Sequence, residues 1–160
     1  MLVAMPRDGT HDAFDMLRNS HARLKERLDD LRQATAGPLD DERRATIDGV
    51  LGFFERAVAR HEADEEASLF PRLSRMPELA SICAALTEEH AVQAELTEAL
   101  GYALDASDED TLRRLADDLA ASYERHILRE EGELFPAAER LLDGDARAAM
   151  FAEMQKRRGR

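Results

Sequence analysis

One sequence pattern occurs twice in the chain and constrains its fold more than any other feature. Residues 61–71 read HEADEEASLFP and residues 126–136 read HILREEGELFP, so both match H-x3-E-E-x2-L-F-P. The interval between His21 and His90 is close to the interval between the two copies. The chain is therefore expected to contain two related helical hairpins, each supplying one histidine and then a histidine with a glutamate four residues later.

Apolar residues recur at steps of three and four residues along most of the chain, which indicates amphipathic helices. Turn-forming residues such as Gly37 and Pro38 separate these stretches. Helices are expected at residues 11–35, 40–72, 78–103, 109–138 and 145–157. Four long helices joined by short loops predict an all-α fold, an up-down-up-down four-helix bundle with a short fifth C-terminal helix.

The two ends of the chain are expected to lie outside the bundle proper. The bundle is predicted at residues 10–140, followed by a short helix and a basic tail at 141–160. Thr10 is predicted to cap the first helix, and His11 to be exposed in its first turn. The tail from Lys156 to Arg160 is expected to complement the last helix dipole and then to fray.

Composition excludes several classes of protein. The formal net charge of −12 argues against nucleic-acid binding. Cys83 is the single cysteine, which rules out an internal disulfide and a CxxC zinc site, and it is expected to be a buried small hydrophobe. Neither a signal peptide nor a membrane-spanning apolar run is recognisable, so a cytoplasmic protein without membrane association is expected.

Each copy of the repeated pattern places a histidine and a glutamate on one helix face. A step of four residues turns an α-helix by only about 40° beyond a full turn. His61 and Glu65 therefore share a face, as do His126 and Glu130. These two pairs are candidates for a common site.

The remaining glutamates of the pattern are expected to have other surroundings. Glu66 and Glu131 lie about 140° away from the histidines around the helix, which predicts that they are solvated. Glu62 lies about 100° from His61, at the margin of the histidine face. Glu62 is therefore an additional candidate ligand.

Four histidines fall on apolar stripes and are expected to point into the bundle: His21, His61, His90 and His126. A single histidine in such a place is usually a hydrogen-bonded core residue. Four of them with two inward glutamates are a different case, because buried charge is costly unless it is paired or coordinated to a metal. A metal site would satisfy all six groups.

The six side chains are too many for one tetrahedral zinc ion and too rich in imidazole for calcium or magnesium. Two metal ions with bridging carboxylates and an oxo or hydroxo bridge account for them, and positions remain for water, a small ligand or Glu62. Mixed imidazole and carboxylate ligation with open positions suits iron. Ligand type alone also admits manganese or zinc.

The pattern of these residues resembles the hemerythrin-like, or HHE cation-binding, family over about residues 12–140. The resemblance implies a non-haem di-iron centre inside a four-helix bundle, with Glu65 and Glu130 as carboxylate bridges. It also implies that O2 or NO binds at an open iron position. Ferritin-like carboxylate bundles use Glu-x-x-His instead, the reverse order with a different step.

Two positions distinguish this chain within that resemblance. Oxygen-carrying hemerythrins have a fifth histidine four residues after the one that His90 matches, where this chain has Ala94. Invertebrate-type oxygen carriage is therefore not carried over. In relatives with fewer histidines, a glutamate directly after the histidine of the second helix also binds iron, and Glu62 occupies that place.

Three functions remain open at this point. The first is binding of O2 or NO by the di-iron centre, for sensing, storage or detoxification. The second is iron handling or iron-centre repair by a labile site, and the third is a metal-free interaction module with an exposed stripe on the last helix. The sequence favours a binding protein over a turnover enzyme without deciding the matter, and it identifies no protein partner. Tyr123 could approach the site, but a packed core tyrosine is expected.

Overall fold

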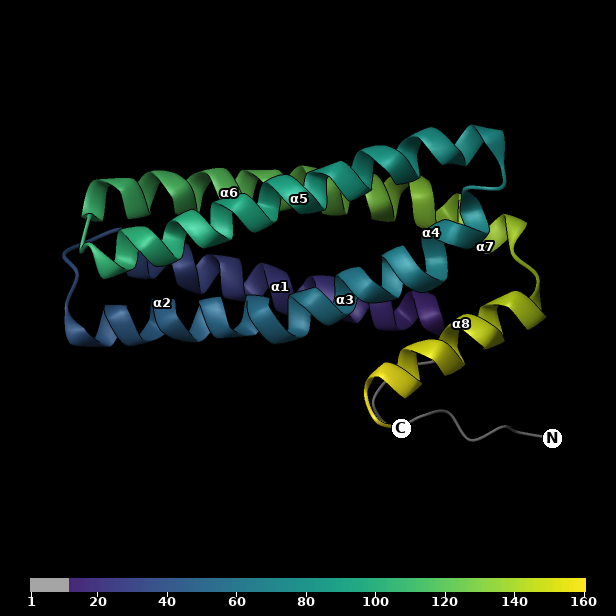
Figure 1. The fold of residues 1–160 in the computed structure, drawn as a ribbon, viewed down its shortest axis with the longest axis horizontal. Coiled ribbons are helices and arrows are strands. Elements are labelled where there is room, and N and C mark those ends of the chain that lie inside the picture. Colours follow the sequence, from purple (N-terminus) through teal and green to yellow (C-terminus); the bar gives the residue numbers. More distant parts are fainter. Residues whose placement is uncertain (1–11) are drawn as a thin grey trace.

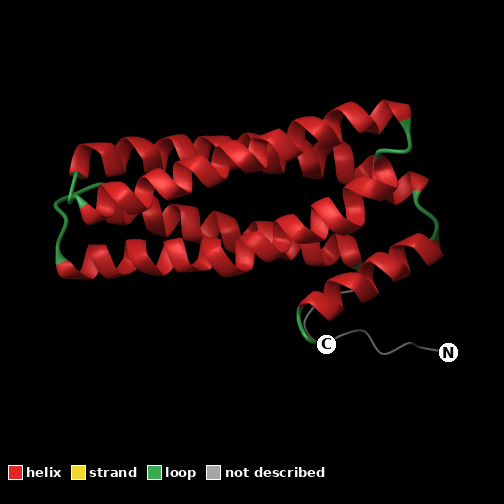
Figure 2. Cartoon of the chain, viewed as in Figure 1, coloured by secondary structure: helices red, strands yellow, loops and turns green. Residues whose placement is uncertain are grey.

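The computed structural model describes residues 12–160, and these form an antiparallel bundle of four long helical rods with an additional short helix (Figures 1 and 2). The first rod is α1 (Ala13–Thr35) and the third is α5 (Pro77–Asp105). The second rod consists of α2 (Asp41–Phe53), η1 (Phe54–Val58), α3 (Ala59–Ala63), η2 (Asp64–Leu69) and α4 (Phe70–Leu73). The fourth consists of α6 (Glu109–Arg129), η3 (Glu130–Leu134) and α7 (Phe135–Leu141), and α8 (Gly144–Arg157) follows. The predicted fold class is confirmed.

Aspartate side chains cap α1, α2, α6 and α8. The Asp12 side chain accepts a hydrogen bond from the Asp15 backbone N–H at 3.0 Å. The N-cap of α1 is therefore Asp12, two residues beyond the predicted Thr10. Thr10 and His11 themselves lie outside the described residues.

The repeated sequence pattern coincides with π-helical turns, which periodicity alone did not predict. The segment η2 contains Glu65, and η3 begins at Glu130. A proline follows each segment, Pro71 within α4 and Pro136 within α7. Proline cannot donate the regular backbone hydrogen bond and its ring crowds the preceding turn, so a wider turn before it is a natural accommodation. Glu65 and Glu130 thus both lie in π-helical segments.

Two separate apolar clusters fill the bundle, one on each side of a layer of histidines. Along α1, Leu17 belongs to one cluster, Leu24 to the other, and His21 lies between them. The second rod repeats this order, with His61 between Val58 and Leu69. The polar layer therefore divides the hydrophobic core.

The last helix is part of the folded body. Met150 and Met154 of α8 are fully buried, in the same cluster as Phe14 and Leu73. The exposed stripe expected on this helix is absent from the described structure, because its apolar residues cover the bundle end at which α4 and α7 lie (Figure 1). The division of the chain at residue 140 stays a prediction.

The basic tail does not fray as expected. Arg157 and Arg158 form ion pairs with Asp64, whose side chain is fully buried. The prediction was wrong because a buried carboxylate on another rod attracts these arginines more specifically than a helix dipole does.

Among the described residues, no helix is both long enough and apolar enough to cross a membrane.

Candidate metal centre

Six side chains from all four rods meet in the middle of the bundle. Their ligand atoms form two groups, and within each group the atoms lie within 4.8 Å of one another. The first group comprises His21, His61, Glu65 and Glu130, and the second comprises Glu65, His90, His126 and Glu130. All six residues expected from the sequence are therefore brought together, and their role as ligands stays a prediction.

Each glutamate lies between histidines of different groups. The Glu65 Oε1 atom is 3.4 Å from Nε2 of His61 and 3.2 Å from Nε2 of His90. The Glu130 carboxylate is 3.3 Å from Nε2 of His21 and 2.5 Å from Nε2 of His126. Both carboxylates are thus placed to be shared by two cations.

Five of the potential donor atoms are buried without a hydrogen-bond partner. Glu65 and Glu130 are fully buried, and none of their four carboxylate oxygens has a hydrogen-bond partner. Nε2 of His21 is also without one. Such buried polar groups cost free energy unless something else satisfies them. The cluster of imidazole nitrogens and carboxylate oxygens fits a cation chemically.

Outside this cluster, the opposite ring nitrogens of three histidines face carboxylates. The Nδ1 contacts are His21 with Glu131 at 3.2 Å, His90 with Glu66 at 3.4 Å, and His126 with Glu89 at 3.6 Å. The contacts of His21 and His90 are of the type that orients metal-binding imidazoles, whereas the His126 distance is too long for a hydrogen bond.

These outer carboxylates were predicted incompletely. Glu66 and Glu131 were expected to be solvated, and their side chains are indeed 43% and 32% exposed. Each nevertheless reaches around to a histidine of a neighbouring rod, because a glutamate is long enough to span that gap. Glu89 was missed, since its only signal in the sequence is that it directly precedes His90.

The two shared glutamates have different protonation preferences in the metal-free protein. Burial and the charge of Glu130 raise the pKa of Glu65 well above its usual value. Burial also opposes ionisation of Glu130, but contacts with Glu65 and two histidines hold its pKa well below its usual value. These opposite directions favour a proton on Glu65 and ionisation of Glu130. Cation binding would release that proton.

The histidines are also tuned by their surroundings. Burial and the neighbouring His21 lower the pKa of His61 to about 3. Burial likewise lowers the pKa of His90. For His21 the burial effect is outweighed by the carboxylates of Glu130 and Glu131, which raise its pKa. His61 and His90 are consequently neutral at physiological pH, the form that binds metals.

Glu62 and Tyr123 lie together beside the cluster. The Tyr123 hydroxyl donates to Glu62 Oε1 at 3.5 Å, and burial together with the nearby Glu66 raises the pKa of Glu62 to about 7. Tyr123 is buried, with its ring 5.6 Å from that of Phe54, so the expected core tyrosine is observed. Glu62 belongs to neither ligand group, and its role as a ligand stays a prediction.

A small internal cavity of about 10 Å³, comparable with one water molecule, adjoins the four histidines. Val58, Glu62 and Tyr123 line this cavity and also line a groove of about 470 Å³ between the second rod and α5. These three side chains therefore separate the histidine cluster from the groove.

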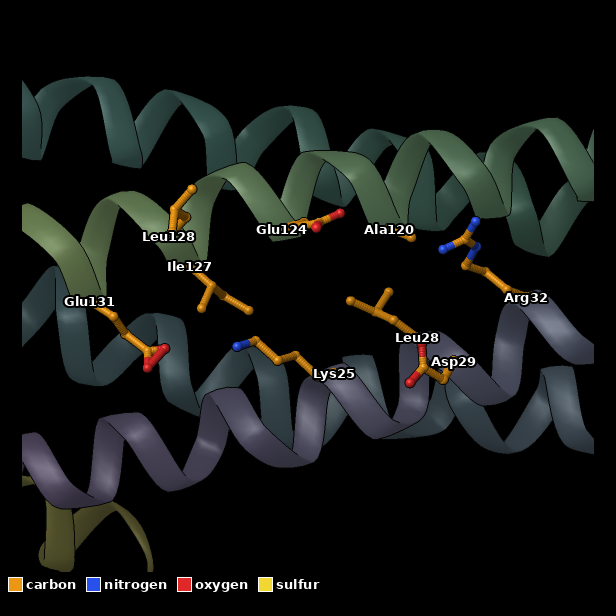
Figure 3. Close-up of a pocket in the computed structure, with 9 residues that line it drawn as sticks. All are labelled: Lys25, Leu28, Asp29, Arg32, Ala120, Glu124, Ile127, Leu128 and Glu131. Carbon is orange, nitrogen blue, oxygen red and sulfur yellow. The ribbon is translucent and has the colours of Figure 1, made fainter.

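A second groove, of about 540 Å³, lies between α1 and α6 (Figure 3). Lys25 and Glu131 both extend into it from opposite sides. Because Glu131 also contacts His21, this groove borders the outer surroundings of the cluster.

A helical bundle that surrounds a buried cluster of four histidines and two glutamates is typical of a cation-binding helical protein. Residues 12–138 match the hemerythrin HHE cation binding domain, so the chain belongs to that family. This confirms the resemblance expected from the sequence. The chain is also 29% identical over 117 residues to an uncharacterized protein of Haemophilus influenzae, covering 70% of this chain and 67% of that protein. No solved structure matches the chain.

Proposed function

We propose that the protein holds two non-haem iron ions in this cluster and binds O2 or NO at an open iron position, for sensing, storage or detoxification. The observation that carries the proposal is the sharing of Glu65 and Glu130 by both histidine groups. Each group offers two imidazole nitrogens and both carboxylates. This set suits two cations bridged by carboxylates better than it suits one.

The donor types support iron. Imidazole with carboxylate oxygen is a combination that iron accepts readily, while the imidazole share is high for calcium or magnesium. Manganese and zinc are compatible with the same donors. Iron is preferred because family members with this residue pattern are expected to hold a di-iron centre.

A pair of reduced iron ions supplies a position and electrons for a small diatomic ligand. The protein supplies the surroundings of that position. Leu24, Val58 and Ile127 form apolar walls of the small cavity and restrict water. The cavity is close to the size of one water molecule, which favours a diatomic ligand over a larger substrate.

A second candidate function, iron handling, is favoured by the groove beside α5. Four carboxylates line this groove: Glu55, Glu62, Glu98 and Asp105. An acidic lining attracts cations and raises their local concentration. The groove reaches the histidine cavity at Glu62, so it is suited to the entrance and exit of iron.

Metal analysis of protein produced with iron tests the proposal. About two iron ions per chain are expected, with strongly reduced content in Glu65→Ala and Glu130→Ala. A wild-type protein that contains no iron and takes up no Fe(II) would overturn it. Leu128→Ala, an exposed position outside the cluster, is the matched control.

The absorption of the reduced protein then separates the two functions. A visible band that appears with O2 and reverses on its removal supports ligand binding. Rapid and complete loss of iron to a strong chelator, without a reversible band, supports iron handling instead.

A further inference from the structure

A buried aspartate adjoins the candidate ligand Glu65 in sequence and is held by the C-terminal helix. Asp64 is fully buried in η2. Arg157 donates from Nη1 to its Oδ1 at 3.0 Å, and Arg158 donates from Nη2 to its Oδ2 at 2.8 Å. Two arginines on both carboxylate oxygens form a charge-assisted contact that resists rotation.

The contact between α8 and the second rod continues along the rod. The Ser68 hydroxyl accepts from Arg157 Nη2 at 2.7 Å and donates to Glu153 Oε1 at 2.7 Å. Arg72 pairs with the same Glu153 at 2.7 Å. Polar contacts from α8 thus span η2 and extend into α4.

The second copy of the repeated pattern has no equivalent contact in the described structure. Arg129 precedes Glu130 where Asp64 precedes Glu65, and the position that matches Ser68 is the exposed Glu133. The ion pair of Arg129 is formed instead with Glu89 of α5, at 3.9 Å. Within residues 12–160, α8 therefore contacts the neighbour of Glu65 but not that of Glu130.

We propose that α8 positions Glu65 for metal binding, with Asp64, Arg157 and Arg158 as positioning residues. Because η2 is a π-helical segment, its rotation is not set by regular α-helical hydrogen bonds. The two arginines fix the rotation of residue 64, and hence the direction in which residue 65 projects. This inference rests on the proposed metal binding, and it adds that the last helix determines how firmly the metal is held.

Arginine substitutions with a matched control test this inference. Arg158→Gln removes two hydrogen bonds to Asp64, and Arg157→Gln removes one to Asp64 and one to Ser68. Arg147→Gln removes the ion pairs of α8 with Asp12 and Glu139, both of which lie outside the η2 contact. The rate of iron release to a strong chelator and the Tm of the metal-free protein are measured for each variant.

Release about 10- to 100-fold faster is expected for Arg158→Gln and for the double variant, with release from Arg147→Gln close to wild type at a similar loss of Tm. Arg158→Lys, which keeps a positive charge, should restore part of the slow release. Equal release rates in all variants, with Tm lowered alike, would show that α8 only stabilises the fold and would overturn the inference. A wild-type protein without iron would overturn the proposed function itself, and the inference with it.

Discussion

The Glu131 carboxylate lies 3.2 Å from Nδ1 of His21, joining the fourth rod to α1 directly outside the cluster. Burial opposes protonation of His21, but this contact and that of Glu130 raise its pKa. In turn, the contact with His21 lowers the pKa of Glu131. A carboxylate in this place favours the proton on Nδ1, so that Nε2 is the nitrogen that would bind a cation after its own proton is released.

Glu131→Ala is expected to weaken iron binding by about 10- to 100-fold, because His21 loses the group that fixes its ring and tautomer. Competition with a chelator of known affinity measures the change. Glu133→Ala removes an exposed glutamate from the same segment and should leave the affinity as in wild type. Equal effects of the two substitutions would contradict the role assigned to Glu131.

Glutamine substitutions of the two shared glutamates should differ in their effect on the stability of the metal-free protein. Because the raised pKa of Glu65 favours its neutral form, Glu65→Gln is expected to leave the Tm of the metal-free protein nearly unchanged. Glu130→Gln replaces an ionised group in contact with two histidines. We therefore expect the free energy of unfolding to fall by about 1–3 kcal/mol.

Both substitutions should nevertheless reduce iron content, because each removes a shared anionic donor. Thermal unfolding of metal-free protein and metal analysis of the same preparations provide the two measurements. Equal destabilisation by the two glutamines would contradict the assigned protonation states.

The free energy of unfolding of the metal-free protein should depend on pH through Glu62. Burial and the nearby Glu66 raise its pKa from 4.5 to about 7 in the folded protein. The folded state therefore binds this proton more tightly than the unfolded state does. The resulting stability is fully present below pH 4.5 and is lost as the pH rises through about 7.

Glu62→Gln removes this dependence. Its free energy of unfolding relative to wild type should increase between pH 4.5 and 7. The slope should be at most about 1.4 kcal/mol per pH unit. Urea unfolding at several pH values measures the difference, with Glu55→Gln in the same groove as the control for loss of one charge. A difference that stays constant with pH would contradict the expectation.

Filling the groove beside α5 should slow ligand binding without abolishing it. Ala94 is exposed and lines this groove, so Ala94→Phe adds bulk in front of Glu62 and Tyr123. Stopped-flow mixing of the reduced, iron-loaded protein with NO should show lower association and dissociation rates and a smaller change in Kd. Leu128→Phe, in the groove between α1 and α6, is the matched control. Slower binding in the control alone would place the route on that side.

The six candidate ligands could be found from the sequence because each depends on local helix geometry. A step of four residues predicts that His61 and Glu65 share one helix face, and the two side chains are in contact in the structure. Apolar neighbours then indicate that this face is inward. The repeated pattern supplied a second, independent copy of the same relationship.

The outer contacts could not be found in this way, since they depend on how closely the rods approach. Glu89 reaches His126 across the boundary between α5 and α6, and no spacing rule connects those positions. The ion pairs of Arg157 and Arg158 with Asp64 require the path of the loop before α8. The π-helical turns were also missed, because hydrophobic periodicity does not report such a local change in helix winding.

The layer of histidines between the two apolar clusters has a consequence for cooperativity. Without a cation, the two apolar clusters are separated by a layer of buried histidines and glutamates in which several polar atoms lack hydrogen-bond partners. Leu17 and Leu24 belong to different halves although both stand on α1. A bridging cation pair would connect the two halves, so that they open as one unit. In the metal-free protein, one half can lose protection against hydrogen exchange before the other. Metal binding would then change the cooperativity of unfolding in addition to the ligands that the protein binds.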